Sequence, residues 1–172
     1  MEITNVVTEN WIKSMLPDNI LKFIVPDYLS LSSRQQILAR RFFDAVETSD
    51  KPLAAMFHVR LSEIDDRLDG LLLEDEGCLL REAMVIVRTL SRNVDRLHRM
   101  VPISRAFGRR CAAHGIASAD YETVAPVLFW IVQECVGSEF NVEMGGALTA
   151  LYDQLSREMK DAAYTTYPQP LP

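Results

Sequence analysis

Residues 107–140, which read FGRRCAAHGIASADYETVAPVLFWIVQECVGSEF, decide the fold. The segment 120–136 has two carboxylates in its first turn and is apolar nearly all round in its second half, which is typical of a helix buried on most sides. Ser118 is placed to cap this helix. Pro126 is expected to bend it, because the proline ring removes a backbone donor and clashes with the preceding turn. The stretch therefore predicts a bent helix in the protein core.

Helical periodicity continues on both sides of this stretch. Upstream, apolar residues recur at spacings of three and four from about residue 78 to residue 101, and Pro102 ends that helix or begins the next. Downstream, a break at Gly137 and Ser138 precedes a last helix over residues 142–163. With only seven glycines and few hairpin signals, the chain is predicted to be all-α. The upstream stripe comprises Leu80, Ala83, Val87, Leu90, Val94, Leu97 and Val101.

The first third of the chain divides into shorter pieces. Ser32 or Ser33 can cap a helix that carries Ile37 to Val46, and Pro52 opens another. The acidic, leucine-rich residues 62–77 are expected to form short turns. We predict an N-terminal helical extension over residues 1–29, one domain over residues 30–164 and a flexible tail over residues 165–172.

Composition limits the function classes. The 172 residues are 48% hydrophobic and 24% charged, an ordinary globular balance. A net charge of -6 argues against nucleic acid as a partner, because nucleic-acid binding draws its affinity from clustered Lys and Arg. Three cysteines without metal-like spacing indicate reduced thiols. With neither a signal peptide nor a membrane span apparent, we expect a cytoplasmic protein.

Catalytic motifs are lacking in the sequence. We find no phosphate-binding glycine loop, no Gly-x-Ser-x-Gly elbow and no metalloprotease motif. His58 and His98 lie apart from any second ligand at metal-binding spacing. We therefore expect a protein that is not an enzyme.

From residue 31 to about residue 163, the order of helices resembles bacterial single-domain haemoglobins and the globin domain of flavohaemoglobins. In that family a Leu-Gly-x-x-His-x-x-x-Gly-Val segment is followed by Tyr-x-x-Val and Leu-Gly-x-x-Phe. The resemblance implies a globin fold with the N-terminal extension added. The matching residues here are Phe107, Gly108, Cys111, Gly115, Ile116, Tyr121, Val124, Val136, Gly137 and Phe140.

The departures from the family pattern fall on the haem residues. Cys111 occupies the position of the proximal histidine, and Leu79 that of the distal glutamine or histidine. By the same alignment His58 replaces the pocket tyrosine, and Leu72 replaces the phenylalanine that wedges against the porphyrin. Tyr121 matches the proximal-side tyrosine.

Two further positions around the haem site are also altered. Glu82 stands where a cation often pairs with a haem propionate. Ala163 stands where a carboxylate would complete the hydrogen-bond network of the proximal-side tyrosine.

Cys111 permits three interpretations: an inert buried thiol, a redox-sensing thiol, or an axial thiolate whose pKa the nearby Arg105, Arg109 and Arg110 would lower. His114 lies nearly one turn further on and could offer its imidazole to a metal instead. The ordinary alternative for His114 is a corner histidine that bonds to the backbone.

These observations favour a regulatory, sensory or protein-interaction module that has lost ordinary haem ligation and needs no cofactor. The alternative is a haem protein that binds a diatomic gas through Cys111 or His114. In place of haem we expect a small apolar cavity that could bind an apolar ligand such as a fatty acid. The expected ligand pocket comprises His58, Leu72, Leu79, Ala83, Cys111, Tyr121, Leu128 and Phe129.

The last two helices carry more apolar surface than one packing face needs. The resemblance implies a homodimer through them, with Trp130, Val127 or Leu151 near the contact. The N-terminal extension is expected to cover the remaining surface or to dock a protein partner.

Overall fold

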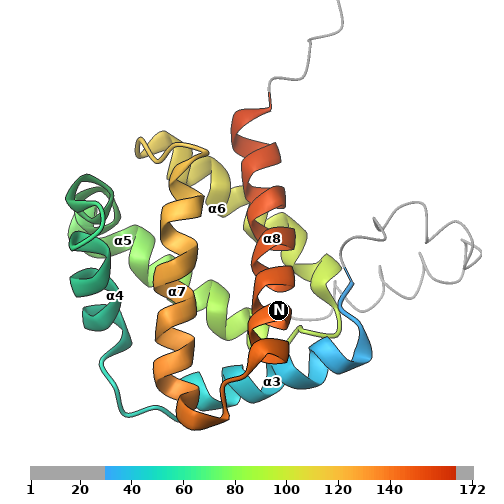
Figure 1. The fold of residues 1–172 in the computed structure, drawn as a ribbon. Helices are drawn as coiled ribbons and strands as arrows, with labels where there is room; N and C mark the ends of the chain where they lie inside the picture. Colours follow the sequence, from blue (N-terminus) through green and yellow to red (C-terminus); the bar gives the residue numbers. More distant parts are fainter. Residues whose placement is uncertain (1–29, 166–172) are drawn as a thin grey trace, which may run out of the picture. The chain divides into compact units, whose positions relative to one another are not determined.

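The computed structural model describes residues 30–165, except the side chains of residues 74–78. Every regular element in this part is helical, so the predicted all-α class is confirmed there (Figure 1). The predicted extension at residues 1–29 and residues 166–172 of the predicted tail lie outside the described residues. The elements are α3 (Ser33–Glu47), α4 (Leu53–Ser62), α5 (Asp66–Ser91), η1 (Leu97–Met100), α6 (Val101–Ala113), α7 (Asp120–Val136), η2 (Gly137–Glu139) and α8 (Val142–Tyr164).

From Leu31 onward, the helices pack around a shared apolar core. The most extensive packing is between α6 and α8, while α3 contacts α5, α7 and α8, and α4 contacts α5 and α7. Figure 1 shows α7 and α8 side by side in front of α5 and α6, with α3 running across one end. This arrangement brings side chains from six α-helices to one central region.

Polar side chains at the helix starts explain where two helices begin. Ser32 and Gln35 form a reciprocal capping box at the start of α3, which confirms Ser32 as a cap. The Asp65 carboxylate accepts a hydrogen bond from the Leu68 amide at 2.9 Å and begins α5. The prediction of short turns over residues 62–77 was therefore wrong, because Asp65 starts a helix that continues through this stretch.

The helix predicted over residues 78–101 is also interrupted. α5 ends at Ser91, where the Ser91 hydroxyl and the Asn93 amide donate hydrogen bonds to backbone carbonyls of the last turn, at 2.8 Å each. η1 then leads into α6, whose first turn contains Pro102 as predicted. Periodicity alone did not reveal the break, because Val94 within the turn and Leu97 at the start of η1 are both buried and continue the apolar spacing.

The start of α7 is fixed by Asp120 rather than by Ser118, which corrects the predicted cap. The Asp120 carboxylate accepts from the Ala117 amide and from Arg67 on α5, each at 2.7 Å. Asp120 is buried and can fold back over the turn, so its carboxylate holds the α6–α7 corner against α5. The helix continues through Pro126.

Among the described helices, none is both long enough and apolar enough to cross a lipid bilayer.

Candidate ligand cavity

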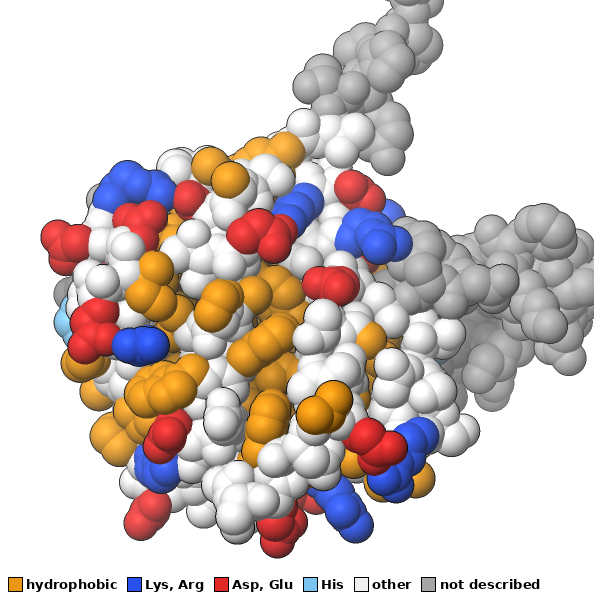
Figure 2. All heavy atoms as spheres, in the orientation of Figure 1, with side chains coloured by type: hydrophobic (Ala, Val, Ile, Leu, Met, Phe, Trp, Pro, Cys, Tyr) orange, Lys and Arg blue, Asp and Glu red, His pale blue; other side chains and the backbone are white. Residues whose placement is uncertain are grey.

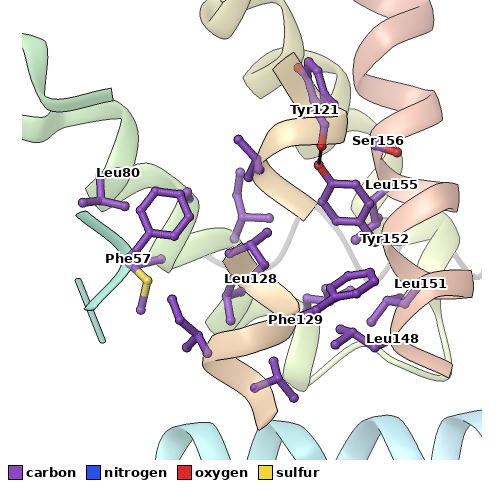
Figure 3. A pocket seen from close by; sticks show the side chains of 18 of the residues that line it. Phe57, Leu80, Tyr121, Leu128, Phe129, Leu148, Leu151, Tyr152, Leu155 and Ser156 are labelled. Atoms are coloured by element: carbon purple, nitrogen blue, oxygen red, sulfur yellow. Dashed lines mark hydrogen bonds between the residues drawn. The ribbon is translucent and has the colours of Figure 1, made fainter. Parts of the chain in front are cut away.

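A cavity of about 220 Å³ lies where the six α-helices meet, and its lining is almost entirely apolar. An engineered apolar cavity of roughly 150 Å³ is large enough to bind benzene, so this volume suits a moderately larger molecule. Figure 3 shows Leu128 and Phe129 of α7 between Phe57 and Leu80 on one side and the α8 side chains on the other. The edge of Phe129 meets the Tyr152 ring, with 5.8 Å between ring centroids.

Six of the eight side chains expected at the pocket line this cavity, and Leu79 and His58 do not. Leu79 is buried, but its neighbour Leu80 takes the lining position on α5. The stripe read from periodicity contains Leu80, Ala83, Val87 and Leu90, all of which line the cavity, so periodicity gave the register that the family alignment missed. The six expected residues found at the cavity are Leu72, Ala83, Cys111, Tyr121, Leu128 and Phe129.

His58 serves a different contact from the expected one. Its Nδ1 lies 2.7 Å from Oδ2 of the buried Asp69, so it joins α4 to α5. Phe57, one residue earlier, reaches the cavity instead. The alignment placed His58 in the pocket, whereas its imidazole is turned toward the Asp69 carboxylate and does not line the cavity.

Cys111 lies in the cavity lining with its side chain buried. Burial raises the pKa of its thiol to about 11, although a contact with Tyr121 acts in the opposite direction. Of the arginines expected to lower this pKa, Arg110 acts in that direction, but burial outweighs it. Arg105 pairs with Glu158 at 2.7 Å and Arg110 pairs with Glu82 at 3.2 Å, so carboxylates offset both cations.

Tyr121 also belongs to the lining, at the α6 end of the cavity (Figure 3). Burial raises the pKa of its phenol, and its hydroxyl has no hydrogen-bond partner of good geometry. The ring meets Tyr164 edge-on at 6.4 Å, close to the helical position where the sequence has Ala163 in place of the family's carboxylate.

Two tyrosines of α8, Tyr152 in the cavity lining and Tyr164 beyond it, were not selected by the sequence analysis. The Tyr152 hydroxyl donates to the Tyr121 carbonyl at 2.6 Å, as Figure 3 shows, and the Tyr164 hydroxyl donates to the Ile116 carbonyl at 2.5 Å. Both bonds fasten α8 to the corner between α6 and α7. The sequence gives little indication of these two hydrogen bonds, because a tyrosine on an amphipathic helix usually lies at the edge of the hydrophobic core.

His114 ends α6 and lies near the backbone, which is the ordinary alternative considered for it. Its Nδ1 is 2.8 Å from the Arg110 carbonyl oxygen, one turn earlier. It does not line the cavity. Within the described residues, no group of three His, Cys, Asp or Glu side chains is arranged to hold a metal ion.

The exposure of side chains on α7 and α8 bears on the predicted subunit contact. Of the three residues expected near a dimer contact, Val127 and Leu151 belong to the core of the chain, at 1% and 2% exposed. Trp130 is half-buried, with the Arg60 guanidinium 5.7 Å from its ring centroid. Figure 2 shows hydrophobic side chains over α7 and along the strip between α7 and α8. The dimer itself stays a prediction.

Comparison with known proteins gives no family for this chain: neither a protein-family model nor a curated protein matches it.

Proposed function

We propose that this chain is a globin-like regulatory or sensory module in which an apolar small molecule takes the place of haem. The observation that supports this most is the 220 Å³ apolar cavity at the meeting point of the helices. Cys111, which the family resemblance aligns with the proximal histidine, lies in the lining of that cavity.

The globin-like assignment draws on the packing of α6 against α8. Gly108, which the family pattern also has as glycine, lies at the crossing of these helices, where an added Cβ would come within 2.6 Å of the Met159 Cα. A glycine at this position is explained by the close approach of two backbones. Globins also pack their helices, eight in the full fold, pairwise around a central pocket, and six α-helices surround the cavity here.

The residues present do not fit a haem. A porphyrin has several times the area of a benzene ring, whereas the cavity is only moderately larger than one that holds benzene. The thiol at Cys111 is held in its protonated form by burial, and an axial ligand must be the thiolate. Glu82, at the position expected to meet a propionate, is paired with Arg110 across α5 and α6.

Ligand binding in a cavity of this kind can regulate a protein by changing the stability of its folded form. A molecule that binds only the folded arrangement stabilises it by mass action, and an effector domain or partner that senses this arrangement can respond. The hydroxyls in the lining are neutral and most are bonded to backbone carbonyls, which supports binding rather than catalysis.

The test is stabilisation by an uncharged apolar probe. Naphthalene should raise the Tm of the protein, since it fills the void. Ala83→Leu places extra methyl groups in the cavity and should reduce the rise severalfold. Ala150→Leu, an equally conservative change at a half-buried alanine of α8 outside the lining, should keep it. A Tm that naphthalene does not change would contradict the proposal.

A further inference from the structure

We propose that the cavity selects an uncharged, hydrocarbon-rich ligand and excludes the carboxylate of a fatty acid. The proposal rests on the proposed function, that the cavity binds an apolar molecule, and it specifies the chemical class. The fatty acid considered from the sequence is therefore set aside in favour of a neutral compound.

The first step is the charge of the lining. Among the described residues that line the cavity there is no Lys, Arg, His, Asp or Glu. An ionised carboxylate moved into such a space loses its hydration without gaining a countercharge, and this cost is far larger than the gain from burying a few extra methylene groups.

The second step is that three basic side chains of α6 and α8 are already engaged in ion pairs. Arg105, Arg110 and Lys160 lie on α6 and α8, but their side chains pair with Glu158, Glu82 and Glu122 at 2.7, 3.2 and 2.7 Å. None of the three cations lines the cavity. An anionic headgroup would have to break one of these ion pairs to obtain a partner.

The third step is the supply of neutral donors. The Tyr152 hydroxyl donates to the Tyr121 carbonyl, and the Ser156 hydroxyl donates to the Asp153 carbonyl at 3.3 Å. The Tyr121 hydroxyl is the lining hydroxyl without a partner of good geometry, and Tyr121 is 7% exposed. One neutral donor can satisfy one ketone, ether or alcohol oxygen, but it cannot replace the hydration of a carboxylate.

The volume sets the size of the ligand. Compared with the roughly 150 Å³ cavity that holds benzene, it suits about eight to ten carbon atoms. We therefore assign the ligand to compact neutral molecules such as a medium-chain alcohol or ketone.

The test compares 1-octanol with octanoate by calorimetric titration of the full chain. At pH 7.5 we expect 1-octanol to bind at least about 100-fold more tightly, because a carboxyl group with a pKa near 4–5 is almost fully ionised there. As the pH falls to 5.5, the apparent Kd of octanoate should fall about tenfold per pH unit, since only the protonated acid enters. The Kd of 1-octanol should stay constant. Ala83→Leu should weaken 1-octanol binding, and Ala150→Leu should not.

Two results would overturn the inference. Octanoate that binds as tightly as 1-octanol at pH 7.5, or whose Kd does not depend on pH, would show that the cavity accepts the anion. If naphthalene stabilises the protein but 1-octanol does not bind, the assignment of ligand class is wrong while the proposed function stands. If neither compound binds, the proposed function itself fails.

Discussion

Cys111 is the residue where the chemistry of this protein departs most from that of a haem globin. Its thiol is buried among apolar side chains, and Arg105 and Arg110 on the same helix are paired with carboxylates. A thiol in these surroundings stays protonated at neutral pH and behaves as a small apolar group. In the structure the residue forms part of the wall of the cavity.

The Cys111 pKa predicts a loss of stability at alkaline pH. Burial raises the pKa from 9.0 to about 11 in the folded protein, so the unfolded chain releases this proton at lower pH. Between pH 9 and 11 the folded state binds more protons, and its stability falls as the pH rises, by about 2–3 kcal/mol in total.

Urea unfolding of the wild type and of Cys111→Ala at pH 8, 9, 10 and 11 measures this contribution. The difference in unfolding free energy between the two proteins should shrink over this range. A constant difference would show that Cys111 ionises equally in both states.

At residue level, sequence reasoning found lining side chains of α6 and α7, and Leu72 and Ala83 of α5, but it also selected two side chains that do not line the cavity. Cys111, Tyr121, Leu128 and Phe129 lie in the stretch with the clearest family pattern. Further upstream the alignment also selected Leu79 and His58, whereas their neighbours Leu80 and Phe57 reach the cavity. Leu79 is buried elsewhere in the core and the His58 imidazole contacts Asp69, so local packing that the alignment does not show decides which side chain lines the cavity.

The close approach of α6 and α8 at their crossing depends on one residue, Gly108. Gly108 is buried on α6, and a Cβ there would meet the Met159 backbone, with its Cα at 2.6 Å. Backbone atoms cannot rotate away as a flexible side chain can. Any larger residue must push the two helices apart.

Gly108→Ala should therefore destabilise the protein by about 1–3 kcal/mol, which is the usual cost of overpacking a core. Gly70→Ala is the matched control, because Gly70 lies within α5 and has open space around its Cα. It should instead stabilise by roughly 0.5–1 kcal/mol through helix propensity. Thermal unfolding of both variants measures the contrast, and equal effects of the two changes would refute the close-crossing account.

At the level of elements, helix type was easier to predict than helix boundaries. The apolar stripes and the Ser32 cap gave the helical class directly. The start of α5 at Asp66 was missed because residues 62–77 look like an acidic loop, whereas Asp65 caps a helix and the aspartates that follow suit its first turn. The break after Ser91 was missed because the apolar period continues through it.

At the scale of the whole molecule, the helices from Leu31 onward enclose an apolar space, and no charged side chain is among the described residues that line it. A haem protein needs an ionised or basic axial ligand, room for the macrocycle and partners for its propionates. At the positions that the proposed globin resemblance assigns to these groups, the protein has a buried thiol, a smaller cavity and a carboxylate that is already paired. We therefore propose that this globin-like arrangement of helices binds no haem.

Haem loading tests this most directly. The protein is expressed with haem supplied to the cells, purified, and titrated with further haemin while the Soret absorbance is recorded. We predict no stoichiometric Soret band and no saturation at one haem per chain. A stable one-to-one complex would contradict the account, and the spectra of Cys111→Ala and His114→Ala would then identify the axial ligand.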